Sequence, residues 1–311
     1  MAGPGLIVLL LAALVLAGLV ALVAVAVVGV RAPAPPPSRA AEAARRHAAV
    51  VHAIALVALV LTLAAGPTLV AGRPADLTQG VLLGLVPAVA GLAFAAVQVV
   101  GEATWPRPSG TVRRAPLARR TARDVAPGRL RRVTWAWALL AVVTLVACGL
   151  VADDGRALTR TWDLGSRSAS PFPGWYYGVP LMLAVAVVLL AAEGLLRLVA
   201  RRPVVSDADP AWDLALRRLS AHRALRGAQL VLAWTAAGVL LVAGGPLRNV
   251  GTRYGLDGEV AELLPMHHLG TAAVVLGLVV ALAGLVIALV PATAVGELRP
   301  APAEHRDRTP A

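Results

Sequence analysis

Long runs of apolar residues alternate along this chain of 311 residues with short segments that carry nearly all of its charge. A helix needs about 20 apolar residues to cross a hydrocarbon core roughly 30 Å thick. Seven runs reach this length, so the pattern predicts an all-α integral membrane protein with a single membrane domain over residues 1–311. The predicted transmembrane helices span about 6–30, 48–70, 79–100, 133–152, 178–200, 228–246 and 268–291.

The first run, 6–30, is expected to remain in the protein as a helix. A cleaved signal peptide begins with a positively charged stretch and has an apolar core of roughly 7–15 residues. Here the preceding segment, MAGPG, has no charged side chain, and the run itself is longer than such a core. Cleavage of a long atypical signal is the alternative.

The arginines are distributed unevenly between the segments that separate the predicted helices. Every second segment is rich in arginine, and the segments 31–47, 101–132, 197–227 and 292–311 together hold 23 of the 29 arginines. Short loops on the cytoplasmic side of a membrane are enriched in arginine and lysine. The distribution therefore predicts that the N-terminus lies outside, and that these three linkers and the C-terminal tail are cytoplasmic.

Composition narrows the chemistry that the chain can perform. All 29 basic residues are arginine, which excludes a Schiff-base lysine and a phosphate-binding loop of the G-x-x-x-x-G-K-[ST] type. The single cysteine, Cys148, lies in an apolar run, so we expect a buried structural thiol and no internal disulfide. The abundance of Arg, Ala, Val, Gly and Pro is typical of a GC-rich bacterial genome, and we therefore expect the bacterial plasma membrane as the location.

The net charge of +12 does not indicate nucleic-acid binding, because no linker is long enough to form a folded basic module. We expect the basic cytoplasmic face to attract anionic lipid headgroups, with a gain on the order of 1 kcal/mol per arginine. The linkers are also a candidate surface for a protein partner. Within 197–227, Asp209 suits an N-cap, Pro210 a first turn and Gly227 a helix end. These signals predict a short helix lying on the inner leaflet.

A third of the aromatic residues lie in SPFPGWYYGVP, directly before the run 178–200. Trp and Tyr are enriched at the membrane interface because their rings are only partly polar. Trp175, Tyr176 and Tyr177 are therefore predicted to anchor the outer end of this helix at headgroup depth. A ligand platform that these rings would form with Phe172 and Trp162 is the alternative.

Ionisable residues within apolar runs are candidates for functional sites. Glu193 is expected to pair with Arg197, because a spacing of four residues places both side chains on one helix face. His52 and Gln98 lie about one turn inside their runs, which is too shallow for a proton relay across the membrane.

His267 and His268, with Glu262 upstream, carry donor groups that suit zinc or copper. Adjacent histidines on a helix point about 100° apart, so a solvated outer rim is favoured over a metal site. We expect no cofactor.

Pro67 and Pro87 fall inside two predicted helices that follow one another in the chain. A proline removes a backbone hydrogen bond from a helix, and interrupted helices line the binding sites of many transporters. This hairpin is therefore the basis of an alternative function as a small-solute transporter or permease.

No catalytic motif of the H-E-x-x-H or G-x-S-x-G type, and no dinucleotide-binding glycine pattern, occurs in the sequence. We therefore expect a protein that is not an enzyme. The sequence favours a non-enzymatic accessory or interaction subunit that recruits a partner through its basic linkers.

The orientation can be tested with single cysteines in a Cys148→Ala background. Thr111 lies in an arginine-rich linker and Ser168 in an arginine-poor one. We expect an impermeant thiol reagent applied to intact cells to label Ser168→Cys and to spare Thr111→Cys. The reverse labelling pattern would overturn the predicted topology.

Overall fold

The computed structural model describes residues 38–72, 77–106, 120–162, 165–254 and 260–290. The predicted first helix, 6–30, and the tail 292–311 lie outside these ranges, so the expected count of seven helices is neither confirmed nor contradicted.

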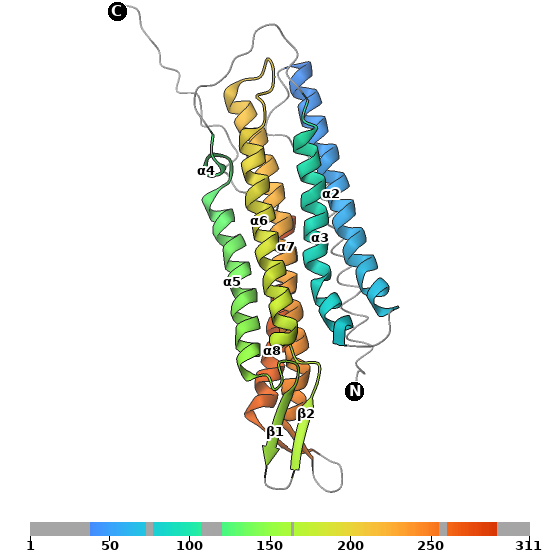
Figure 1. The fold of residues 1–311 in the computed structure, drawn as a ribbon. Helices are drawn as coiled ribbons and strands as arrows, with labels where there is room; N and C mark the ends of the chain where they lie inside the picture. The colour runs from blue at the N-terminus through green and yellow to red at the C-terminus, as the bar shows by residue number, and fades with distance from the viewer. Residues whose placement is uncertain (1–37, 73–76, 107–119, 163–164, 255–259, 291–311) are drawn as a thin grey trace, which may run out of the picture.

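The described chain is a bundle of long helices that run up and down along one axis (Figure 1). Six helices of the described part are long and apolar enough to cross a membrane, which makes this a helical, multi-pass membrane protein. These six are α2 (Arg39–Ala71), α3 (Leu77–Ala103), α5 (Gly128–Val151), α6 (Trp175–Arg201), α7 (Pro210–Val250) and α8 (Pro265–Leu289). A single turn, α4 (Ala122–Val125), precedes α5.

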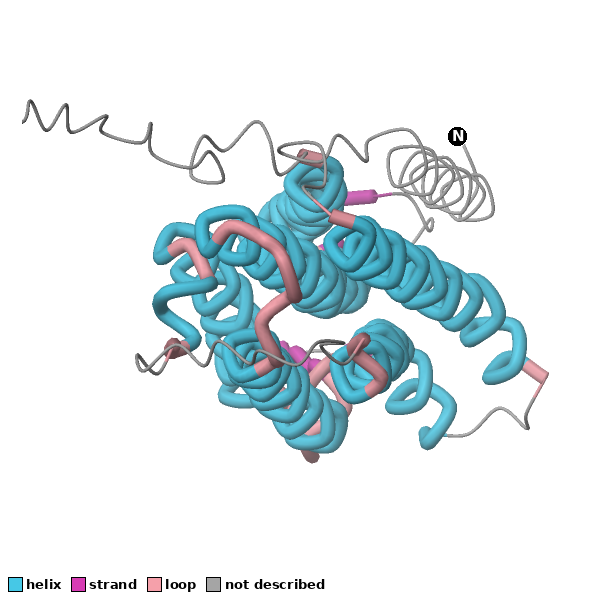
Figure 2. The backbone as a smooth tube through the Cα atoms, turned by 90° about the horizontal axis from the view of Figure 1, so that it is seen from above, coloured by secondary structure: helices cyan, strands magenta, loops and turns pink. Residues whose placement is uncertain are grey.

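Helix α7 is the centre of the bundle. It packs against α2, α3, α5, α6 and α8, and the view along the bundle axis shows the helices gathered side by side (Figure 2). In the apolar 18-residue stretch of α7, 61% is buried inside the protein, whereas the corresponding share is 22–33% in the other five spanning helices. The outer faces of those helices carry the exposed apolar residues, for example Leu61, Leu139 and Leu190, as expected for surfaces that face lipid.

The two ends of the bundle differ. One end, here called the basic end, contains α4, the first residues of α2, α5 and α7, and the last residues of α3, α6 and α8 (Figure 1). The other, the hairpin end, carries two small antiparallel sheets that the sequence analysis did not anticipate. They pair β1 (Leu158–Trp162) with β2 (Gly165–Ala169), and β3 (Thr252–Tyr254) with β4 (Val260–Leu263).

The strands escaped sequence analysis because each has only three to five residues, too few for a period of two to stand out. The first hairpin is held by contacts that involve the turn before it. The Asp153 side chain accepts a hydrogen bond from the backbone N–H of Thr159 at 2.6 Å, and Asp154 and Gly155 have φ of 49° and 68°. Arg167 then links the two hairpins by donating to the carbonyl of Thr252 at 2.9 Å.

The prediction of a short helix on the inner leaflet, ending at Gly227, was wrong. Asp209 does cap the helix, accepting from the N–H of Ala211 at 2.6 Å, and Pro210 is its first residue. The helix then continues through Gly227 to Val250 as the single 41-residue α7. A Cβ at position 227 would lie 2.5 Å from Cε1 of Phe94, so the glycine permits a close approach of α3 to α7 instead of ending a helix.

This role of Gly227 can be tested against a glycine of the same helix. Gly227→Ala would force a Cβ into the Phe94 ring, and overpacking of this kind costs about 1–3 kcal/mol. Gly238 has open space around it, so Gly238→Ala should be neutral or stabilise, since alanine is the better helix former. We expect thermal unfolding in detergent micelles to show a lower Tm for Gly227→Ala alone, and equal shifts would contradict the close approach.

Candidate functional site

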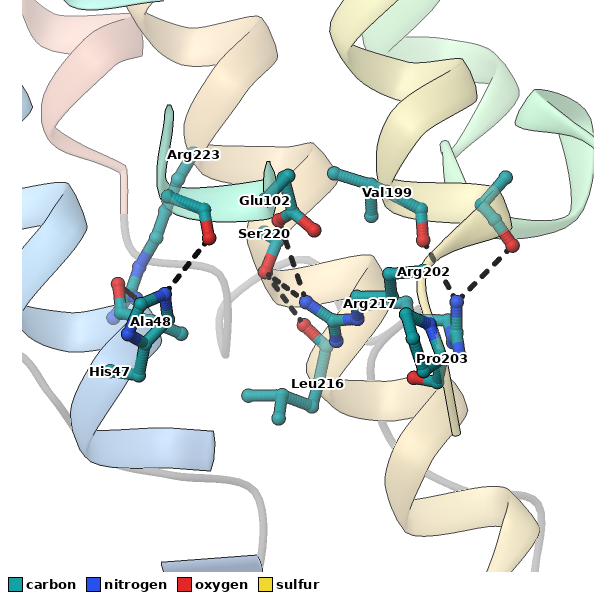
Figure 3. A network of polar contacts seen from close by, with 12 residues as sticks. His47, Ala48, Glu102, Val199, Arg202, Pro203, Leu216, Arg217, Ser220 and Arg223 are labelled. Carbon is teal, nitrogen blue, oxygen red and sulfur yellow. Dashed lines mark hydrogen bonds and ion pairs between the residues drawn. The ribbon is translucent and has the colours of Figure 1, made fainter. Parts of the chain in front are cut away.

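Charged side chains are buried together at the basic end. Asp213 and Arg217, one turn apart on α7, form an ion pair in which Arg217 Nε lies 2.8 Å from Asp213 Oδ2, and their side chains are 0% and 1% exposed. The remaining guanidinium nitrogens of Arg217 donate to the carbonyls of Val199, Ala200 and Pro203 (Figure 3). A second guanidinium, that of Arg120, also donates to Asp213 Oδ2. The pair therefore ties α7 to the end of α6 and to the segment before α4.

A second buried pair lies beside the first. Arg202, which follows α6, has Nη1 3.6 Å from Glu102 Oε1 of α3 and 3.3 Å from the Ser220 hydroxyl of α7. Its guanidinium carbon lies 3.9 Å from the centre of the Trp105 ring, a cation–π arrangement. Burial lowers the pKa of Arg202 to about 10, so the group is still charged at neutral pH.

These residues are called here the arginine clamp: Arg202 with Glu102, and Arg217 with Asp213 and Arg120. The clamp is enclosed by apolar residues of the same end, since Trp105, Trp212 and Leu216 form one buried cluster with Ala41 and Ala44 of α2. His47 of α2 adds a hydrogen bond to the carbonyl of Gly101 at 2.9 Å (Figure 3). The basic end is therefore folded around its own apolar core, and the clamp residues have defined partners within it.

A second group of polar residues lies further along α7, between the clamp and the apolar half of the helix. His222 is 3% exposed, and Arg223 and Arg226 are half-buried. Gln229 donates to the carbonyl of Leu130 at 2.9 Å and to the Thr134 hydroxyl at 3.1 Å, both on α5. On the opposite side, Gln98 of α3 lies 3.2 Å from Nδ1 of His52 of α2.

The structure gives Glu193 a different partner from the expected one. Its carboxylate accepts two hydrogen bonds of 3.0 Å from Nη2 of Arg131 on α5, whereas Arg197 is exposed. The expected pairing within one helix was wrong because a neighbouring helix supplied a guanidinium that binds both carboxylate oxygens.

The metal candidates at the hairpin end have other contacts. His267 Nδ1 lies 2.9 Å from the Thr252 hydroxyl, and Glu262 forms an exposed ion pair with Arg253 at 3.3 Å. His268 meets His267 edge to face, with ring centres 5.9 Å apart. Among the described residues, no group of three His, Cys, Asp or Glu side chains is placed to hold a metal ion.

The aromatic stretch is divided between surface and core. Trp175 and Tyr176, the first residues of α6, are 40% and 41% exposed, whereas Tyr177 and Phe172 are buried. Trp175 packs over Gly149 of α5, and Tyr177 packs over Gly80 of α3, where added Cβ atoms would lie 2.6 Å and 2.8 Å from the rings. Tyr177 therefore fills a notch between helices, and an anchoring role at headgroup depth stays a prediction for the exposed pair.

Pro67 and Pro87 lie inside the uninterrupted helices α2 and α3. Pro67 is exposed and Pro87 half-buried. Their neighbours Gly66 and Val86 are in contact, because a Cβ at position 66 would lie 2.7 Å from a Val86 methyl group. The two prolines thus flank a close packing contact between α2 and α3.

The clamp was not predicted from the sequence, although the sequence contains one signal for it. Asp213 and Arg217 have the spacing of four that favours an ion pair on a helix, but Arg217 was assigned to a lipid-facing surface together with the other linker arginines. Glu102 and Arg202 come from segments 100 residues apart in the chain, and no local pattern connects them.

No model of a known protein family matches the chain, and no curated protein and no solved structure shows significant similarity to it.

The contribution of the clamp can be measured with one carboxylate and a matched control. Asp213→Asn removes the carboxylate that pairs with Arg217 and Arg120 among the described residues, and breaking a buried pair in this way costs about 3–5 kcal/mol. Glu262→Gln removes a carboxylate whose pair with Arg253 is 53% exposed on both sides, which should cost only about 0–1 kcal/mol. Denaturant titration of the micellar protein gives both free energies of unfolding, and equal losses would contradict a structural role for the clamp.

Proposed function

We propose that the protein is a non-enzymatic accessory subunit of the bacterial plasma membrane, whose basic end lies in the cytoplasm and binds an acidic surface of a partner protein. The observation that carries the proposal is the folded state of the basic end. A rigid surface loses less conformational entropy on binding than a set of mobile linkers does.

The surface available for binding is strongly basic. Exposed arginines surround the clamp on four helices, namely Arg39 and Arg46 of α2, Arg123 of α4, Arg129 and Arg132 of α5, and Arg197 and Arg201 of α6. Charges arranged in this way steer an acidic partner and fix its orientation more than they add affinity. The same excess of arginine favours a cytoplasmic location of this end, with the N-terminus outside.

The transporter alternative has less support. It depends on Pro67 and Pro87, both of which lie in uninterrupted helices, whereas transporter sites are typically built on helices that are unwound near the middle of the membrane. The described residues offer no carboxylate at that depth on these two helices.

The proposal can be tested by neutralising part of the basic surface without inverting its charge, since inversion could change the topology itself. Arg46, Arg123 and Arg132 would be changed together to Gln, and in a matched control to Lys, which retains the charge. A second control would carry Arg156→Gln and Arg253→Gln at the hairpin end. Each protein would be crosslinked in intact cells, purified and analysed by quantitative mass spectrometry.

We expect the crosslinked amount of at least one cytoplasmic protein to fall about tenfold in the Gln variant, which corresponds to a loss of roughly 1.4 kcal/mol in binding free energy. The same protein should be crosslinked undiminished in both controls. That protein, once purified, should bind the subunit in nanodiscs with an affinity that falls as salt is raised. If no protein depends on the three arginines, the accessory role is wrong, and solute uptake by reconstituted proteoliposomes would favour the transporter.

A further inference from the structure

Two arginines near the middle of α7, Arg223 and Arg226, have no carboxylate partner among the described residues. Neither takes part in any of the ion pairs that Arg120, Arg131, Arg202, Arg217 and Arg253 form there. Arg223 reaches from α7 to α2, where its Nη1 is 3.5 Å from the carbonyl of Ala48 (Figure 3). In the described part of the chain, the hydrogen-bond partners of Arg226 are neutral: Nη1 lies 3.1 Å from Gln229 Oε1 and Nε 3.5 Å from His222 Nε2.

The N–H groups of His222 and Arg226 outnumber the acceptors that lie next to His222. His222 Nε2 faces both the carbonyl of Val290, at 3.4 Å, and the N–H of Arg226. If Nε2 carries the proton, it can donate to the carbonyl but cannot accept from Arg226. If Nε2 accepts from Arg226, the proton lies on Nδ1, which is buried and has no partner. In either tautomer one N–H of this group is left without an acceptor.

His52 of α2 lies one turn beyond Ala48, the residue that Arg223 contacts. Gln98 Nε2 donates to His52 Nδ1 at 3.2 Å, which places the imidazole proton on Nε2. His52, His222, Arg223 and Arg226, called here the unpaired cluster, therefore offer a concentration of N–H donors and two positive charges from α2 and α7.

The position of the unpaired cluster along the bundle indicates the depth of the group that it would bind. Ala48 begins the apolar run of α2, and Arg226 directly precedes the apolar run of α7. The cluster thus lies where charged linker gives way to membrane-spanning helix, which is the depth of the lipid headgroups.

We propose that the unpaired cluster is a binding site for a phosphate group, with Arg223 and Arg226 as the charged contacts and His52 as a further donor. Phosphate supplies the negative charge that the described surroundings lack, together with further acceptor oxygens. Guanidinium groups bind it with parallel hydrogen bonds. The phosphate can belong to an anionic phospholipid or to a soluble molecule. This site does not depend on the proposed partner protein, whose contacts would be the exposed arginines.

The test compares ligand response with intrinsic stability. Wild-type protein, Arg223→Gln/Arg226→Gln and a control, Arg132→Gln/Arg197→Gln, would be purified in a neutral detergent and stripped of lipid. The probes are phosphatidylglycerol, phosphatidylcholine and inorganic phosphate, with chloride at equal ionic strength as the reference. Tm would be measured for each combination, and native mass spectrometry would count retained lipids.

We expect phosphatidylglycerol or phosphate to raise the Tm of the wild type and of the control by roughly 3–8 °C, as ligand binding to the folded state requires. The Arg223/Arg226 variant should lose this response. Without ligand, the same variant should be at least as stable as the wild type, because two uncompensated charges have been removed from a half-buried place. A purely structural role predicts the opposite, a lower Tm with and without ligand.

The two probes distinguish the source of the phosphate. Stabilisation by phosphatidylglycerol, but not by millimolar inorganic phosphate or phosphatidylcholine, identifies a lipid headgroup, whereas stabilisation by phosphate alone identifies a soluble ligand. The proposal is overturned if neither probe stabilises the wild type, or if the control loses the response as fully as the Arg223/Arg226 variant. Should the double variant not fold, Arg223→Gln and Arg226→Gln singly provide the same comparison.

Discussion

The burial of the Asp213 carboxylate against Arg217 is the constraint on which the basic end depends. A charge enclosed in protein is tolerated only when an opposite charge and further hydrogen bonds compensate for its lost hydration. Arg217 meets this condition by donating to three carbonyls at the end of α6. Oδ2 of Asp213 accepts from both Arg217 and Arg120, whereas Oδ1 has no partner among the described residues. The contact with Arg120 joins residues 93 apart in the chain, and the contacts with Val199, Ala200 and Pro203 hold the start of α7 against the end of α6. α7 therefore cannot shift at this end without exposing or unpairing a charge.

The continuity of α7 connects the clamp with the rest of the molecule. One helix carries Asp213 and Arg217 of the clamp, three residues of the unpaired cluster and the apolar centre of the bundle. The basic end is therefore joined to the membrane-spanning part by continuous helix. Gly227 is the contact that brings Phe94 of α3 against this helix. Polar groups on both sides of this contact, Gln98 with His52 and Gln229 with Thr134, satisfy one another between helices.

The arginines of the chain thus serve different purposes, although they look alike in the sequence. Arg202 and Arg217 are enclosed and paired, Arg46 and Arg132 are exposed, and Arg223 and Arg226 are half-buried without a carboxylate among the described residues. Pairing fixes structure, exposure provides a surface, and partial burial without compensation marks a place where an anion would be stabilised. The proposed partner surface and the proposed phosphate site rest on this division.

The sequence by itself determined the six spanning helices of the described part to within a few residues at most ends. The reason is that the thickness of the hydrocarbon core sets the length of apolar run that a spanning helix needs, and this length can be read directly from the sequence. The sequence also separated arginine-rich from arginine-poor segments, which lie at opposite ends of the bundle. Only the tertiary structure decided the partner of Glu193, the extension of α7 through Gly227, and the burial of Arg217. Those outcomes depend on which helices become neighbours, and the free energy of a charge or a glycine is set by those neighbours and not by the adjacent residues in the chain.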